Sequence, residues 1–147
     1  MSSVSSSRIR SINQAPERPD ADHVLYWMTA ARRLDSNFGL QHAVDLARDR
    51  DRPLIVLEAL RSGYRFASDR LHRFVLDGMA EHDRRLADSK VLYWPYVEPA
   101  AGEGRGLLAA LAARAAIVVT DDLPCFFLPR MLRAAGESLD VRLVAVD

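Results

Sequence analysis

The stretch VLYWMTAARRLDSNFGLQHAVDLARDRDRPLIVL, residues 24–57, decides the fold. Its first five and last four residues are continuously apolar, as expected for strands that are covered on both faces. Between them lies one apolar stripe at helical spacing, made of Leu40, Ala43, Val44 and Ala47. Ser36 precedes this stripe and is the expected N-cap. The stretch therefore predicts a βαβ unit with parallel strands.

The same alternation continues to the end of the sequence. Apolar runs predict further strands at 91–94, 117–119 and 141–146, and we expect Pro95 and Pro99 to end the first of these. Helical stripes separate them at 69–86, 108–115 and 128–135, the last with Gly136 as its C-cap. Trp27 and Trp94 lie inside strand runs and are expected in the core. The sequence therefore predicts an α/β fold, a five-stranded parallel sheet with helices on both faces.

Composition narrows the class of protein. The chain has 147 residues, 20 basic and 20 acidic, so its formal net charge of 0 does not favour a module that binds nucleic acid through overall charge. Residues 1–22 are polar and Ser-rich and are expected to be a mobile arm, although composition leaves open whether the part around Ile9 and Ile12 docks on the body. Residues 23–147 are expected to form one domain. No run of eighteen apolar residues and no secretory signal is found, so a cytoplasmic location is expected.

Signatures of chemistry are few. No Gly-rich phosphate loop or P-loop follows any strand, and the four histidines lack metal-ligand spacing, so no metal site is expected. A parallel sheet binds ligands beyond the carboxyl ends of its strands, here at 29–37 and 120–125. Asp121 and Asp122 could form an acid/base pair or a ligand clamp, although a strand-end turn is favoured. Cys125, the only cysteine, is expected to be a small buried hydrophobe.

Arg32 and Arg33, which follow the first strand, are the most suggestive cations. As a pair they could bind an anion or face a partner domain. Ordinary solvation of a loop is an equally good explanation.

Several segments resemble, in order, the N-terminal α/β domain of class II cyclobutane pyrimidine dimer DNA photolyases, which belong to the photolyase/cryptochrome superfamily. They are RIRSIN (8–13), VLYWM (24–28), RPLIVLEAL (52–60), RLHRFVLDGMAEHDRRLA (70–87) and VVTDDLPCFFLPRML (118–132). The resemblance implies strand order three-two-one-four-five. It also implies a second, helical domain that carries FAD and a pocket for the flipped lesion.

The resemblance further implies a role. This chain would be the antenna domain of a deoxyribodipyrimidine photo-lyase in light-driven DNA repair, holding a chromophore of deazaflavin type. The chromophore would lie near the strand-end residues Met28, Thr29, Arg32, Asp121 and Asp122. No catalytic residue maps onto this chain, which would be catalytically incompetent alone and would reach DNA only through the helical FAD-binding domain, present in cis or as a separate chain.

Two alternatives remain open from the sequence. One is a free-standing nucleotide-binding α/β module of the universal-stress or electron-transfer-flavoprotein type, which needs only the fold and a cleft. The other is a non-catalytic remnant that acts in protein interactions. If a surface meant for the helical domain is uncovered, the chain is expected to self-associate. No membrane partner is expected.

Overall fold

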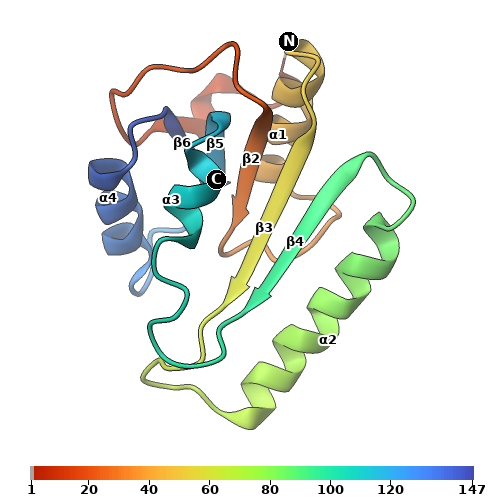
Figure 1. The fold of residues 1–147 in the computed structure, drawn as a ribbon, viewed down its shortest axis with the longest axis vertical. Coiled ribbons are helices and arrows are strands. Elements are labelled where there is room, and N and C mark those ends of the chain that lie inside the picture. Colours follow the sequence, from red (N-terminus) through yellow and green to blue (C-terminus); the bar gives the residue numbers. More distant parts are fainter. Residues whose placement is uncertain (1) are drawn as a thin grey trace.

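The computed structural model describes residues 2–147 and shows a sheet of six strands in the order β1-β6-β5-β2-β3-β4 (Figure 1). The strands are β1 (Ile9–Ser11), β2 (His23–Met28), β3 (Leu54–Leu60), β4 (Val91–Val97), β5 (Ala115–Asp121) and β6 (Leu143–Val146). The helices are α1 (Phe38–Asp49), α2 (Asp69–Leu86), α3 (Leu107–Ala112), α4 (Leu128–Ser138) and a short 3-10 turn, η1 (Ser6–Arg8). Strands β2 to β6 are parallel in the predicted order.

The two layers of helices pack against opposite faces of this sheet. Successive side chains of β2 point to opposite faces of the sheet. Tyr26 belongs to the apolar cluster beneath α1, whereas Leu25 belongs to the cluster beneath α3 and α4. The C-terminal part of α2 covers β3 and β4 on the α1 side. The prediction of an α/β fold with helices on both faces is confirmed.

The strand count was wrong because the N-terminal arm adds a strand. Residues 9–11 pair antiparallel with β6, and the amide of Ile12 donates to the carbonyl of Leu143 at 2.9 Å. The side-chain amide nitrogen of Asn13 donates to the carbonyls of Leu139 and Val141, and its side-chain oxygen accepts from the main-chain N–H of Leu143. Residues 9–13 of the arm are therefore docked on the sheet, through hydrogen bonds that the short polar sequence does not predict.

Three predicted element ends also need correction. Strand β4 continues through Pro95 to Val97, because it is an edge strand with a single hydrogen-bonded neighbour. Asn37, not Ser36, caps α1 by accepting from the Leu40 amide, and Ser36 has a left-handed φ of 50°. Gly136 lies inside α4, and the C-cap is Leu139.

Parts of the apolar surface have no cover in residues 2–147. Trp94, expected in the core, is 41% exposed on the edge strand β4, and Trp27 is half-buried. The N-terminal half of α2 extends beyond the sheet (Figure 1), and there Phe74 is 79% exposed, close in sequence to Phe66 at 71%. Among the described helices, none has both the length and the apolar character that crossing a membrane requires.

Candidate functional site

The candidate site is a cleft of about 280 Å³ at the carboxyl ends of β2 and β5. The chain leaves β2 toward α1 on one face of the sheet and leaves β5 toward α4 on the other. This is the point at which the strand order reverses, where open α/β sheets place their ligands. The residues that line the cleft include Ala30, Ala31, Asn37, Phe38, Asp121 and Asp122.

Asp121, the last residue of β5, ties the two strands together at this cleft. One of its carboxylate oxygens accepts the main-chain N–H groups of Thr29, Ala30 and Ala31 at 2.9, 2.8 and 2.9 Å. Its other oxygen accepts the hydroxyl of Tyr26 at 2.5 Å. The residue is 6% exposed. The chain thus turns three consecutive amides toward a single buried carboxylate oxygen.

Buried polar groups around Asp121 hold this arrangement. Burial raises the pKa of Tyr26 well above its usual range, and the neighbouring Asp121 carboxylate raises it further, so the phenol stays protonated and donates. Asn37 donates to the carbonyls of Ala31 and Arg33 and shapes the loop that follows β2. A Cβ on Gly39 would lie 3.0 Å from both Asp121 Oδ1 and a ring carbon of Tyr26, so α1 approaches this closely only through glycine.

A second buried carboxylate, Glu58 on β3, lies on the same face of the sheet and is 1% exposed. Its Oε1 accepts from the Arg32 guanidinium at 3.0 Å, and its Oε2 lies 2.7 Å from His82 Nδ1 and accepts the Tyr93 hydroxyl at 2.7 Å. Burial raises the pKa of Tyr93 well above its usual range, and its hydrogen bond to Glu58 adds to this shift. The sequence prediction missed this cluster, although Glu58 is the only charged residue in the apolar run 54–60.

The structure brings some of the candidate binding residues together and separates others. Thr29 and Asp121 meet at the cleft, whereas Met28 is 1% exposed and packs in the core beneath α1. Arg32 turns away from the cleft to Glu58 and to the carbonyl of Ala59. Asp122 forms a two-pronged ion pair with Arg10 of the arm, at 2.8 and 2.9 Å. Arg32, the candidate for anion binding, is therefore already paired with the carboxylate of Glu58.

The segment after β5 also corrects one prediction. Cys125 is exposed, not buried, and Phe126 is 93% exposed with a left-handed φ of 56°. The apolar neighbours suggested a core position, but the core on this face is completed by residues of α4 such as Leu128 and Leu132.

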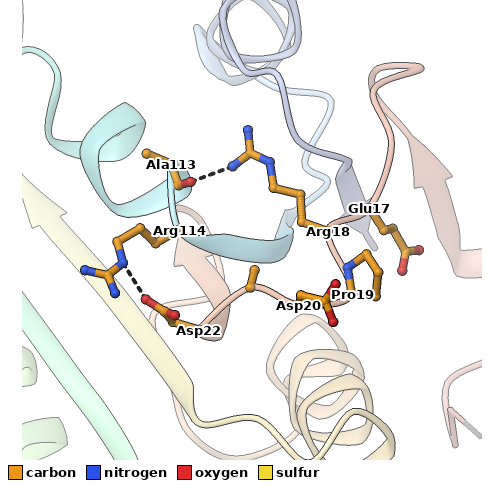
Figure 2. Close-up of a pocket in the computed structure, with 8 residues that line it drawn as sticks. Glu17, Arg18, Pro19, Asp20, Asp22, Ala113 and Arg114 are labelled. Carbon is orange, nitrogen blue, oxygen red and sulfur yellow. Dashed lines mark hydrogen bonds and ion pairs between the residues drawn. The ribbon is translucent and has the colours of Figure 1, made fainter.

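A larger hollow of about 490 Å³ lies at the opposite, amino ends of β2 and β5 (Figure 2). Several of its charged side chains have partners: Arg114 contacts Asp22, and Arg18 donates to the carbonyl of Ala113 at 2.7 Å. Arg18 also pairs with Asp140. These contacts connect the arm to the sheet. Because parallel sheets bind ligands beyond the carboxyl ends of their strands, the smaller cleft is the better candidate.

The two adjacent carboxylates at the cleft, Asp121 and Asp122, have separate partners. The oxygens of Asp121 are engaged by amides and a phenol, and Asp122 is engaged by Arg10, so the two carboxylates do not form an acid/base pair that shares a proton. No group of three or more metal-type side chains lies together in residues 2–147.

Comparison with known proteins supports one family. The sequence matches no protein-family profile. It is 34% identical over 80 residues to the deoxyribodipyrimidine photo-lyase of Methanothermobacter thermautotrophicus (strain Delta H), a match that covers 53% of this chain and 18% of the relative. The match thus covers less than a fifth of that protein's length. This similarity supports a relation of the chain to the photolyase family.

Proposed function

We propose that this chain is the antenna part of a class II deoxyribodipyrimidine photolyase and holds a light-harvesting chromophore in the cleft between β2 and β5. The observation that carries the proposal is the 34% identity to the archaeal photo-lyase. The predicted strand order, which the sheet has, and a cleft at its switch point are consistent with it.

The walls of the cleft suit a planar aromatic ligand of deazaflavin type. Ala30 and Ala31 offer small side chains on one side, and Phe38, 48% exposed, offers an aromatic ring. The guanidinium of Arg8 lies 4.4 Å from the centre of that ring and covers one of its faces. Small and aromatic side chains with a few fixed polar groups are typical of small-molecule sites.

In this proposal the chain collects light and breaks no bond. Dimer splitting would belong to a helical FAD-binding unit, whose excited reduced flavin gives an electron to the dimer and recovers it after the ring opens. This chain's residues would hold the chromophore and exclude water from it, and DNA would be contacted by the helical unit. The rim of the cleft and the uncovered apolar side chains, including Leu123 and Phe127, would face that unit.

Chromophore binding tests the proposal directly. The purified chain is titrated with 8-hydroxy-5-deazariboflavin and binding is followed by fluorescence anisotropy. We expect saturable binding that Ala31→Trp, which fills the cleft, weakens at least tenfold. Ala113→Trp, at the amino-end hollow, is the matched control and should bind as the unsubstituted chain does. Absence of binding, or equal loss in both variants, would contradict a chromophore site in this cleft.

The expected partner gives a second test. The chain is mixed with the helical FAD-binding unit of a class II photolyase, and repair of a dimer-containing oligonucleotide is measured under light absorbed by the deazaflavin. We expect the chain to raise the repair rate only when the chromophore is bound. An unchanged rate with a chromophore-loaded chain would argue against the antenna role.

A further inference from the structure

We propose that Asp121 is a specificity-determining residue that occupies the anion position of the cleft and so excludes ligands bearing a phosphate there. This inference deepens the proposed function, on which its choice of chromophore rests. It concerns the class of ligand: a planar molecule with no phosphate on the side that faces β5.

One carboxylate oxygen of Asp121 lies where three main-chain N–H groups converge. Asp121 Oδ2 receives three consecutive main-chain N–H groups at 2.8 to 2.9 Å, distances typical of hydrogen bonds to an ionised acceptor. Successive amides that converge in this way form an anion-binding concavity, the arrangement that proteins use for phosphates. Here the anion is supplied by the chain itself.

A second observation is the position of this concavity. Thr29 to Ala31 form the first loop after β2, at the switch point of the sheet. In dinucleotide-binding α/β folds the corresponding loop is rich in glycine and receives the pyrophosphate. In this chain the loop has no glycine, and the carboxylate of the neighbouring strand fills the place of the phosphate. Both the absence of glycine and the presence of this carboxylate indicate that the loop does not receive a phosphate.

Asp121 is also fixed in place. It ends a buried strand, its second oxygen accepts from Tyr26, and Gly39 of α1 packs against it. A phosphate could not displace it without breaking five hydrogen bonds: three from main-chain amides, one from a phenol and a longer one, at 3.5 Å, from the Thr29 hydroxyl.

Two of the arginines near the cleft are already paired with carboxylates. Arg10 pairs with Asp122, and Arg32 pairs with Glu58, so both guanidinium groups already face carboxylates. Arg33 lines the rim but is exposed, where water screens its charge. A phosphate that entered would meet a buried carboxylate and an occupied set of donors.

Paired chromophores test the specificity. Dissociation constants of the unsubstituted chain are measured for 8-hydroxy-5-deazariboflavin and for its 5′-phosphate. We expect the phosphorylated compound to bind at least tenfold more weakly, and equal or tighter binding would overturn the inference. If neither compound binds, the proposed function fails, and the phosphate experiment below still decides the inference about Asp121.

Inorganic phosphate tests the anion position without any chromophore. In the unsubstituted chain, the amide NMR signals of Thr29, Ala30 and Ala31 should not shift when chloride is replaced by phosphate at constant ionic strength. Saturable shifts of these signals would overturn the inference, whatever any variant does.

A vacated position should accept the anion. Asp121→Ala should have a lower Tm than the unsubstituted chain, and phosphate should raise that Tm relative to chloride at the same ionic strength. Asp122→Ala, which removes the neighbouring carboxylate but not the bonds to the three amides, should show no such rescue. A folded Asp121→Ala chain that phosphate does not stabilise would contradict the inference. If Asp121→Ala does not fold, the same rise of Tm with phosphate is measured for Asp121→Asn. The amide shifts of the unsubstituted chain then remain the independent test of the inference.

Discussion

At the scale of single residues, the two buried carboxylates on the α1 face have different partners. Asp121 is neutralised by main-chain amides and Glu58 by side chains from three other segments. Both hold the loop after β2, because Asp121 binds its amides and Glu58 binds its Arg32. The shape of the cleft therefore depends on these two buried strand acids rather than on residues of the loop alone.

Removing Glu58 should be costly for stability. Glu58→Ala would leave Arg32, His82 and Tyr93 without their shared acceptor in a buried position, and we expect the free energy of unfolding to fall by about 3 kcal/mol. Urea denaturation measures this difference. Asp77→Asn, which removes an exposed pair with Arg73, is the control and should have little effect. Similar losses in both variants would contradict the importance of the buried cluster.

Glu98 predicts a dependence of stability on pH. The amide of Ser62 and those of Gly104 and Gly102 donate to its carboxylate and lower its pKa. A lowered folded-state pKa means that this stabilisation is complete above the unfolded value, about 4.3, and disappears as pH falls through the lower folded value. We therefore expect Glu98→Gln to be less stable than the unsubstituted chain at neutral pH, with the gap closing below about pH 4. A gap that stays constant across this range in urea denaturation would contradict the assignment.

At the scale of elements, the N-terminal arm completes the sheet at the edge formed by β6. Its contacts span the molecule, since Arg10 reaches Asp122 at the cleft and Arg50 pairs with Glu17 beside α1. Near its start, the amide and hydroxyl of Ser3 donate to Asp45 at 2.7 and 2.8 Å. The arm is therefore coupled to the cleft through the pairing of Arg10.

Gly136 of α4 tests how tightly the arm packs. A Cβ there would lie 2.8 Å from Cγ2 of Ile12 and 3.3 Å from its carbonyl oxygen. We expect Gly136→Ala to destabilise the chain by about 1–3 kcal/mol through overpacking and to speed hydrogen exchange in β1. Gly78→Ala in α2, where a Cβ would meet nothing within 4 Å, should stabilise by up to about 1 kcal/mol through helix propensity. Stabilisation in both variants would contradict close docking of the arm.

At the scale of the whole molecule, the helices leave part of the apolar surface uncovered. Leu92 and Trp94 lie on one face of the edge strand β4. Leu71 and Phe74 lie in the N-terminal half of α2, which extends beyond the sheet, and Phe66 lies just before this helix. Exposed apolar groups of this size promote association. In the proposed function, some of this surface would be covered by the helical unit.

The isolated chain should therefore self-associate at high concentration. Phe66→Ser combined with Phe74→Ser removes the two most exposed aromatic side chains near α2, and we expect it to lower the weight-average mass in sedimentation equilibrium. Lys90→Ser, an exposed position with no apolar side chain, is the control. A monomeric unsubstituted chain, or a double variant that associates equally, would contradict association through this surface.

How far the sequence predicts the site can be judged from particular residues. The edge of the sheet that holds the cleft was predictable, because apolar runs locate the strands and parallel pairing brings their carboxyl ends together. Asp121 was a candidate for this reason. Glu58 was not, although an acid inside an apolar run signals a buried partner, and that partner, His82, lies 24 residues away in the chain. Trp94 and Cys125 were misplaced because local apolarity does not show which faces a helix covers.

By itself, the sequence determined the alternation of strands and helices and the parallel pairing of the strands, since these follow from hydrophobic periodicity and chain connectivity. The strand order was implied by the resemblance, and the edge at which a ligand would bind was predicted from the parallel sheet. Only the tertiary structure decided that the arm adds a sixth strand, that Arg32 pairs with Glu58, and that Asp121 accepts three main-chain amides. The physical reason is that main-chain amides carry no side-chain signature and that ion pairs between distant segments exist only once the sheet has brought them together.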